Sequence, residues 1–142
     1  MKKQRILLIE DDTYTRDAYE EILKDSGYEV DTAVDGQEGI LKIHKGGYSL
    51  IFLDVMMPKV DGLDVLRSLK NDPPKTSNGP IILLTNLTHD PVIFLATDLG
   101  AKGHLVKSDI TPGELVEAVK KYIQPTKNDK KPFTNQEPIK EE

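Results

Sequence analysis

The sequence predicts an α/β fold in which five parallel strands form one sheet and helices cover both of its faces. Short apolar runs alternate along the chain with segments whose apolar residues recur at helical spacing. The runs are continuous rather than alternating with polar residues, as in strands that are buried on both faces. Together these two observations indicate a strand-helix unit repeated five times.

The strands are predicted from the apolar runs at residues 6–9, 50–53, 81–84 and, more weakly, 105–106. A further strand is expected over residues 28–34, where Val30, Thr32 and Val34 alternate with polar residues, as in a strand at the edge of a sheet. We expect the spatial order 2-1-3-4-5, because that order would bring the ends of the polar-tipped strands together.

The helices are predicted from apolar residues at a helical period in residues 18–23, 63–69 and 115–123, with further helices following residue 35 and around residues 92–95. Asp35 with Glu38, and Thr111 with Glu114, fit capping boxes, and Asp12 can cap the first helix. Gly27, Gly46, Gly47 and Gly100 are expected to end helices.

The composition predicts one domain over residues 1–124, followed by a disordered tail or truncated linker over residues 125–142, which is rich in proline and charge. The absence of cysteine excludes disulfides and thiolate metal sites. The net charge of −5 disfavours binding to nucleic acid or to anionic membranes. No apolar run is long enough for a membrane span or an export signal, so we expect a cytoplasmic protein without membrane contact.

Polar residues follow the strands at their carboxyl ends. Glu10, Asp11 and Asp12 follow the first strand. Asp54, Thr85 and Lys107 follow the third, fourth and fifth strands. Each of these residues alone has an ordinary interpretation as a cap, a turn residue or a surface charge. In the expected strand order, however, all of them would face one crevice at the carboxyl edge of the sheet.

Such a group of carboxylates needs a cation. Like charges about 4 Å apart repel by about 4 kcal/mol per pair at an effective dielectric constant of 20. Oxygen ligands favour Mg²⁺, which Mn²⁺ should replace, and the lack of histidine and cysteine in the group argues against zinc. A carboxylate beside a divalent cation and a lysine can attack phosphorus, and Asp54 is the best candidate for that nucleophile.

At these residues the chain resembles the receiver domain of bacterial response regulators, which has a flavodoxin-like (βα)5 fold. The resemblance covers about residues 5–123. The matching segments are residues 6–12 (ILLIEDD), 53–58 (LDVMMP) with Asp61-Gly62, 82–85 (ILLT) and 100–107 (GAKGHLVK).

The resemblance implies a two-component signalling switch in which Asp54 takes a phosphoryl group from the phosphohistidine of a sensor histidine kinase or phosphotransfer protein. It implies a Mg²⁺ site formed by Asp11, Asp54 and the main-chain carbonyl of Met56, with Glu10 acting through water. Thr85 would move to bond one phosphoryl oxygen and Lys107 would pair with another. The chain would catalyse only its own phosphorylation and dephosphorylation.

Three residues depart from the family pattern. His104 stands where tyrosine or phenylalanine is usual. It either turns inward with Thr85 as part of the switch, with a pH dependence, or is an ordinary exposed histidine. Ser108 stands where a cis-proline is common, so that either a cis bond is retained or the loop takes another path. Asn86 stands where a smaller residue is common.

The apolar run at residues 92–95 is too continuous for one buried helix stripe. Part of it should be exposed beside the fifth strand. The resemblance implies that the fourth helix, fifth strand and fifth helix form a face for an effector or a second copy. The alternative is a deeper local core.

Three other functions are alternatives. A haloacid-dehalogenase-type Mg²⁺ phosphatase would need an aspartate where Thr13 stands, and a cap domain. A flavin-binding module would need a phosphate loop where residues 10–12 are acidic. A receiver-like binding scaffold that never takes phosphate is disfavoured by the presence of Asp11, Asp54, Thr85 and Lys107.

Overall fold

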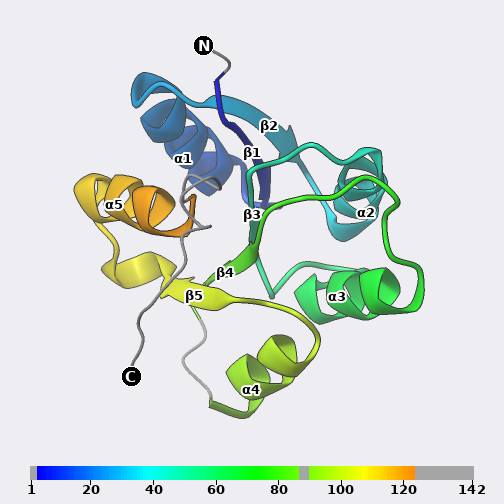
Figure 1. Cartoon of the computed structure of the whole chain (residues 1–142). Coiled ribbons are helices and arrows are strands. Elements are labelled where there is room, and N and C mark those ends of the chain that lie inside the picture. Colours follow the sequence, from blue (N-terminus) through cyan, green and yellow to red (C-terminus); the bar gives the residue numbers. More distant parts are fainter. Residues whose placement is uncertain (1–2, 87–89, 124–142) are drawn as a thin grey trace, which may run out of the picture.

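The computed structural model describes residues 3–86 and 90–123, in which strands and helices alternate along the chain (Figure 1). The strands are β1 (Arg5–Ile9), β2 (Glu29–Ala33), β3 (Leu50–Leu53), β4 (Ile81–Thr85) and β5 (Gly103–Val106). The helices are α1 (Thr13–Asp25), α2 (Gly36–Lys45), α3 (Gly62–Asn71), α4 (Asp90–Asp98) and α5 (Pro112–Tyr122), with a short 3₁₀ helix at Lys107–Asp109.

The five strands form one parallel sheet in the order β2-β1-β3-β4-β5, which confirms the predicted fold class and strand order. The register aligns Ile9 of β1 with Leu53 of β3, and Thr85 of β4 with Val106 of β5. Parallel strands in this register end at the same edge. The residues that follow them therefore collect there.

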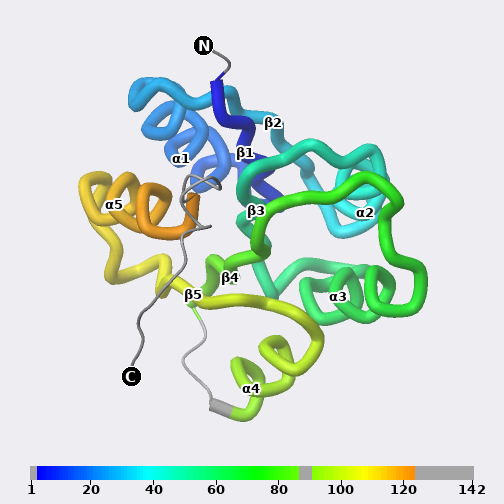
Figure 2. The backbone as a smooth tube through the Cα atoms, in the orientation of Figure 1, coloured from blue at the N-terminus to red at the C-terminus, as the bar shows by residue number. Residues whose placement is uncertain are grey.

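The sheet separates two hydrophobic cores, because successive side chains of a strand point to opposite faces. Leu7, Ile9 and Leu53 pack with α2, α3 and α4 on one face. Ile6 and Leu8 pack with α1 and α5 on the other face. The chain path in Figure 2 shows the same division into three layers. The continuous apolar runs therefore mark strands covered on both sides, as predicted.

The helix starts confirm most of the capping predictions. Asp12 and Asp35 cap α1 and α2, and Thr111 forms a capping box with Glu114 at α5. At α2, however, the Glu38 carboxylate accepts from the N–H of Val34 rather than from that of Asp35. A capping box at α3, between Asp61 and Asp64, was not predicted from the sequence.

The other predictions concern the edge strand, the C-terminal tail, membrane crossing and the apolar run of α4. The edge strand is slightly shorter than predicted, at Glu29–Ala33. The predicted tail at residues 125–142 lies outside the described residues. None of the described helices combines the length and apolar content that crossing a bilayer requires. On α4, Phe94 is 71% and Leu95 is 38% exposed, which confirms the predicted exposure of part of the run.

Candidate functional site

The loop after β1 is held in place by hydrogen bonds from α1 and from its own backbone. The Asp12 N–H donates to Glu10 Oε2 over 3.0 Å. The Arg16 guanidinium donates to the carbonyls of Glu10, at 2.8 Å, and Asp11, at 3.3 Å. The Asp12 carboxylate is occupied in capping, since it accepts from both the N–H and the hydroxyl of Thr15. This leaves Glu10 and Asp11 as the carboxylates of the loop that face the sheet edge.

Asp54 begins the loop after β3 and is only 3% exposed. Its N–H donates to the carbonyl of Ile9 over 3.1 Å, which continues the pairing of β1 with β3. Its Oδ1 accepts from the N–H of Met56 over 3.3 Å. Behind the loop, a Cβ on Gly62 would lie 2.5 Å from the Asp54 carbonyl oxygen, so α3 approaches the loop as closely as only glycine allows.

Lys107 joins the two buried carboxylates. Its Nζ donates to Glu10 Oε1 over 2.8 Å and to Asp54 Oδ2 over 3.2 Å. Burial disfavours the charged ammonium, but the hydrogen bond to Glu10 and the attraction of Asp54 outweigh burial and raise the pKa of Lys107. Burial also raises the pKa of Glu10 to about 7, although the hydrogen bonds from Lys107 and Asp12 oppose this rise.

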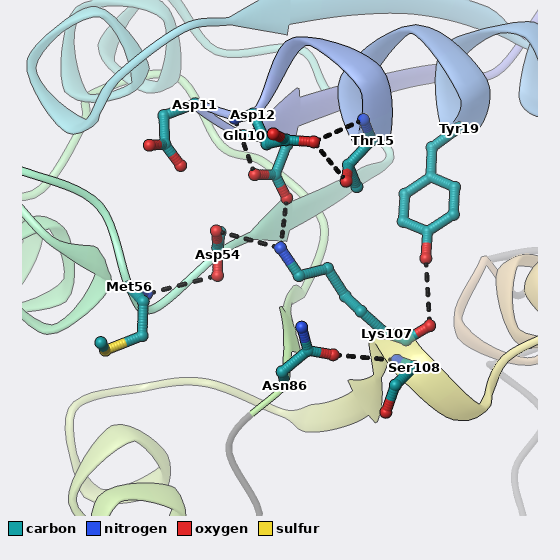
Figure 3. A pocket seen from close by; sticks show the side chains of 10 residues that line it. All are labelled: Glu10, Asp11, Asp12, Thr15, Tyr19, Asp54, Met56, Asn86, Lys107 and Ser108. Atoms are coloured by element: carbon teal, nitrogen blue, oxygen red, sulfur yellow. Dashed lines mark hydrogen bonds and ion pairs between the residues drawn. The ribbon is translucent and has the colours of Figure 1, made fainter.

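These residues surround a cavity of about 630 Å³ at the carboxyl edge of the sheet (Figure 3). The cavity is lined by Glu10, Asp11, Asp12, Thr15, Tyr19, Asp54, Met56, Asn86, Lys107 and Ser108. The structure thus brings together all predicted site residues except two. Thr85 is fully buried at the end of β4 and does not line the cavity. His104 is exposed on β5 and borders a separate hollow with Asp109 and Glu114.

The cavity has the donor set of a site for a hard divalent cation. Glu10, Asp11 and Asp54 each offer a carboxylate oxygen, and these oxygens lie within 4.8 Å of one another. Within the part of the chain that the structure describes, no other cluster of metal-ligating side chains meets the same criterion. One ammonium, from Lys107, contacts two of these three carboxylates. Oxygen ligands and uncompensated negative charge suit Mg²⁺.

Several contributions to the site were not predicted from the sequence. Arg16 fixes the β1–α1 loop through main-chain carbonyls, and Tyr19 donates its hydroxyl proton to the carbonyl of Lys107 over 3.5 Å. A basic residue one turn into the helix that follows an acidic loop was the available signal for Arg16. Next to Lys107, the N–H of Ser108 donates to the side chain of Asn86. The Lys107–Ser108 bond is trans, since the described residues contain no cis bond.

The family model described as the response regulator receiver domain matches residues 6–120. The chain belongs to this family. It is a receiver domain of the two-component response regulator type.

The receiver domain is similar to parts of several curated regulators. It is 41% identical over 105 residues to the transcriptional regulatory protein DltR of Streptococcus agalactiae, covering 72% of this chain and 45% of the relative. It is 34% identical over 118 residues to a gliding motility regulatory protein of Myxococcus xanthus, covering 83% of this chain and 15% of the relative. The chain therefore spans less than half the length of both relatives.

Solved receiver structures share the fold. The chemotaxis protein CheY4 of Vibrio cholerae is 28% identical, with a TM-score of 0.74 over 85% of this chain and 99% of that one. The response regulator TrrA of Thermotoga maritima, solved in complex with Mg²⁺ and BeF, is 34% identical, with a TM-score of 0.70 over 84% of this chain and 98% of that one.

Proposed function

We propose that this receiver domain is a phosphorylation-dependent switch in which Asp54 accepts the phosphoryl group of a phosphohistidine on a sensor histidine kinase or phosphotransfer protein. The observation that carries the proposal is the buried Asp54 carboxylate, which lies at the cavity with an ammonium 3.2 Å from one of its oxygens. An Asp54 oxygen forms the new bond to phosphorus. The nitrogen–phosphorus bond of the donor breaks, and its electron pair returns to the imidazole nitrogen.

The residues of the cavity fit a resident Mg²⁺, which Mn²⁺ should replace. Asp11, Asp54 and the main-chain carbonyl of Met56 would hold it, with Glu10 contributing through water. The ion would neutralise phosphoryl oxygens and align the donor and acceptor. The similarity to TrrA, whose structure contains Mg²⁺ and BeF, supports this assignment. Lys107 would offer its ammonium to a further phosphoryl oxygen when it leaves the Asp54 carboxylate.

The switch would operate through Thr85. Because its side chain is fully buried and lies outside the cavity lining, it must move to bond a phosphoryl oxygen. Reversing a 1:99 population needs about 5.5 kcal/mol of differential stabilisation. Two or three hydrogen bonds to a charged group, each worth about 1.5–3 kcal/mol, are sufficient.

The consequence of this movement would reach the face formed by α4, β5 and α5. His104 lies on β5 at this face and would turn inward as Thr85 moves, and α4 contributes the exposed ring of Phe94 to the same face. An effector or a second copy of the chain would bind there.

The test is the intact mass of the chain after incubation with acetyl phosphate and Mg²⁺. We expect one phosphoryl adduct in the wild type, none in Asp54→Asn, and a normal adduct in the control Asp61→Asn, whose side chain caps α3. An unchanged wild-type mass would contradict the proposal.

A further inference from the structure

The side chain of Asn86 is oriented by the loop after β5. Asn86 follows β4, and Ser108 lies in the 3₁₀ helix that follows β5. The Ser108 N–H donates to Asn86 Oδ1 over 2.9 Å. A main-chain N–H can only donate, so the amide oxygen must face Ser108 and the amide nitrogen must point the other way. The contact requires a residue with an N–H at position 108, which proline would not supply.

The amide nitrogen of Asn86 consequently faces the cavity. In Figure 3 it lies on the side of the Lys107 ammonium and Asp54, while the oxygen faces Ser108. Among the described residues, Asn86 Nδ2 has no hydrogen-bond partner. The cavity wall beside Asp54 thus carries two sets of donors, the ammonium of Lys107 and the amide of Asn86. Donors that converge beside a nucleophile are suited to an anion.

We propose that Asn86 Nδ2 is a hydrogen-bond donor to an oxygen of the phosphoryl group on Asp54, and that the Ser108 N–H positions it. This rests on the proposed function, since it concerns the same bound group. A phosphoryl group has three terminal oxygens and accepts more hydrogen bonds than Lys107 alone supplies. Because Asn86 is exposed, its bond to Ser108 adds little to folding stability, and its effect falls on the ligand.

The direct test uses ¹⁵N-labelled protein with Mg²⁺ and beryllofluoride, which mimics a phosphoryl group on a carboxylate. The side-chain amide signal of Asn86 is assigned by its loss in Asn86→Ala. We expect this signal to move when beryllofluoride binds, while the side-chain signal of Asn71, exposed at the end of α3, stays in place.

Variant affinities give a second readout. Asn86→Ala should bind beryllofluoride roughly ten- to hundred-fold more weakly, as expected for one lost hydrogen bond to a charged group. Asn86→Asp keeps an oxygen for the Ser108 N–H but turns a negative charge toward the cavity, so it should bind more weakly still. Asn71→Ala should bind as the wild type does.

The outcomes separate this inference from the proposed function. If the wild type binds beryllofluoride with the Asn86 amide signal unmoved and Asn86→Ala keeps the wild-type affinity, Asn86 only ties two loops together and the inference fails alone. If the wild type neither binds beryllofluoride nor takes a phosphoryl adduct, the inference and the proposed function both fail.

Discussion

Lys107 Nζ lies 3.2 Å from Asp54 Oδ2, although 53 positions separate the two residues in the chain. The same ammonium lies 2.8 Å from Glu10 Oε1. Both carboxyl groups are almost completely buried, so a single cation compensates two acids at the centre of the site. The stability of the domain and its response to ions should therefore depend on Lys107 more than on any surface lysine.

Replacement of Lys107 tests this dependence. We expect Lys107→Met to lower the free energy of unfolding of the metal-free protein by about 3–5 kcal/mol, because it leaves buried carboxylates without a cation. Mg²⁺ should restore part of the loss. Urea unfolding with and without Mg²⁺ measures both effects. The control is Lys102→Met at an exposed lysine before β5, and equal losses in the two variants would contradict the expectation.

Glu10 should make the metal-free protein less stable as the pH rises. Burial raises its pKa from 4.5 to about 7, so its favourable contribution is complete below pH 4.5 and is lost as the pH rises through 7. The loss is expected to reach up to about 3 kcal/mol. The contribution of Glu10 is isolated by measuring the free energy of unfolding of the wild type and of Glu10→Gln from pH 4.5 to 8, with a chelator present. Parallel stability curves for the two proteins would refute the assignment.

Asp11 should act in metal binding rather than in folding. It is one of the three clustered carboxylates, and Lys107 contacts the other two. Asp11→Asn removes one charge from the cluster, so Mg²⁺ affinity should fall roughly tenfold or more. Titration calorimetry compares this variant with Asp17→Asn on the exposed side of α1. A wild-type Mg²⁺ affinity in Asp11→Asn would remove Asp11 from the site.

Gly62 is expected to be required for the position of the Asp54 loop. A Cβ there would lie 2.5 Å from the Asp54 carbonyl oxygen and 2.8 Å from Val55 Cα. Gly62→Ala should therefore lower stability by about 1–3 kcal/mol and slow phosphorylation. The matched control is Gly113→Ala in α5, where a Cβ meets nothing within 4 Å and stability should rise by about 0.5–1 kcal/mol. If the two variants change stability and phosphorylation alike, the close approach of α3 to the Asp54 loop is unimportant.

Much of the fold could be predicted because its signals are local. The continuous run at residues 50–53 marks a strand buried on both faces, and Thr111 with Glu114 forms the capping box that its spacing indicates. Local signals also place Glu10, Asp54 and Lys107 at strand ends. Their proximity follows from the predicted strand order, which the observed sheet confirms.

The remaining contacts depend on geometry between distant elements. No local pattern indicates that Glu10 bonds Lys107 directly, or that Arg16 uses main-chain carbonyls rather than a carboxylate. The orientation of Asn86 depends on an N–H 22 positions away. At α2, the path of the chain brings the Glu38 carboxylate to the N–H of Val34, one residue before the N–H of Asp35 that the capping pattern indicates.

The central claim, that Asp54 is the residue that carries phosphate, is tested most directly by locating the acyl phosphate. Borohydride reduces an aspartyl phosphate to homoserine, which peptide mass mapping places in the sequence. After incubation with acetyl phosphate and Mg²⁺, we predict homoserine at position 54 and its absence when Mg²⁺ is chelated. Homoserine at position 11 or 12, or at no position, would contradict the account.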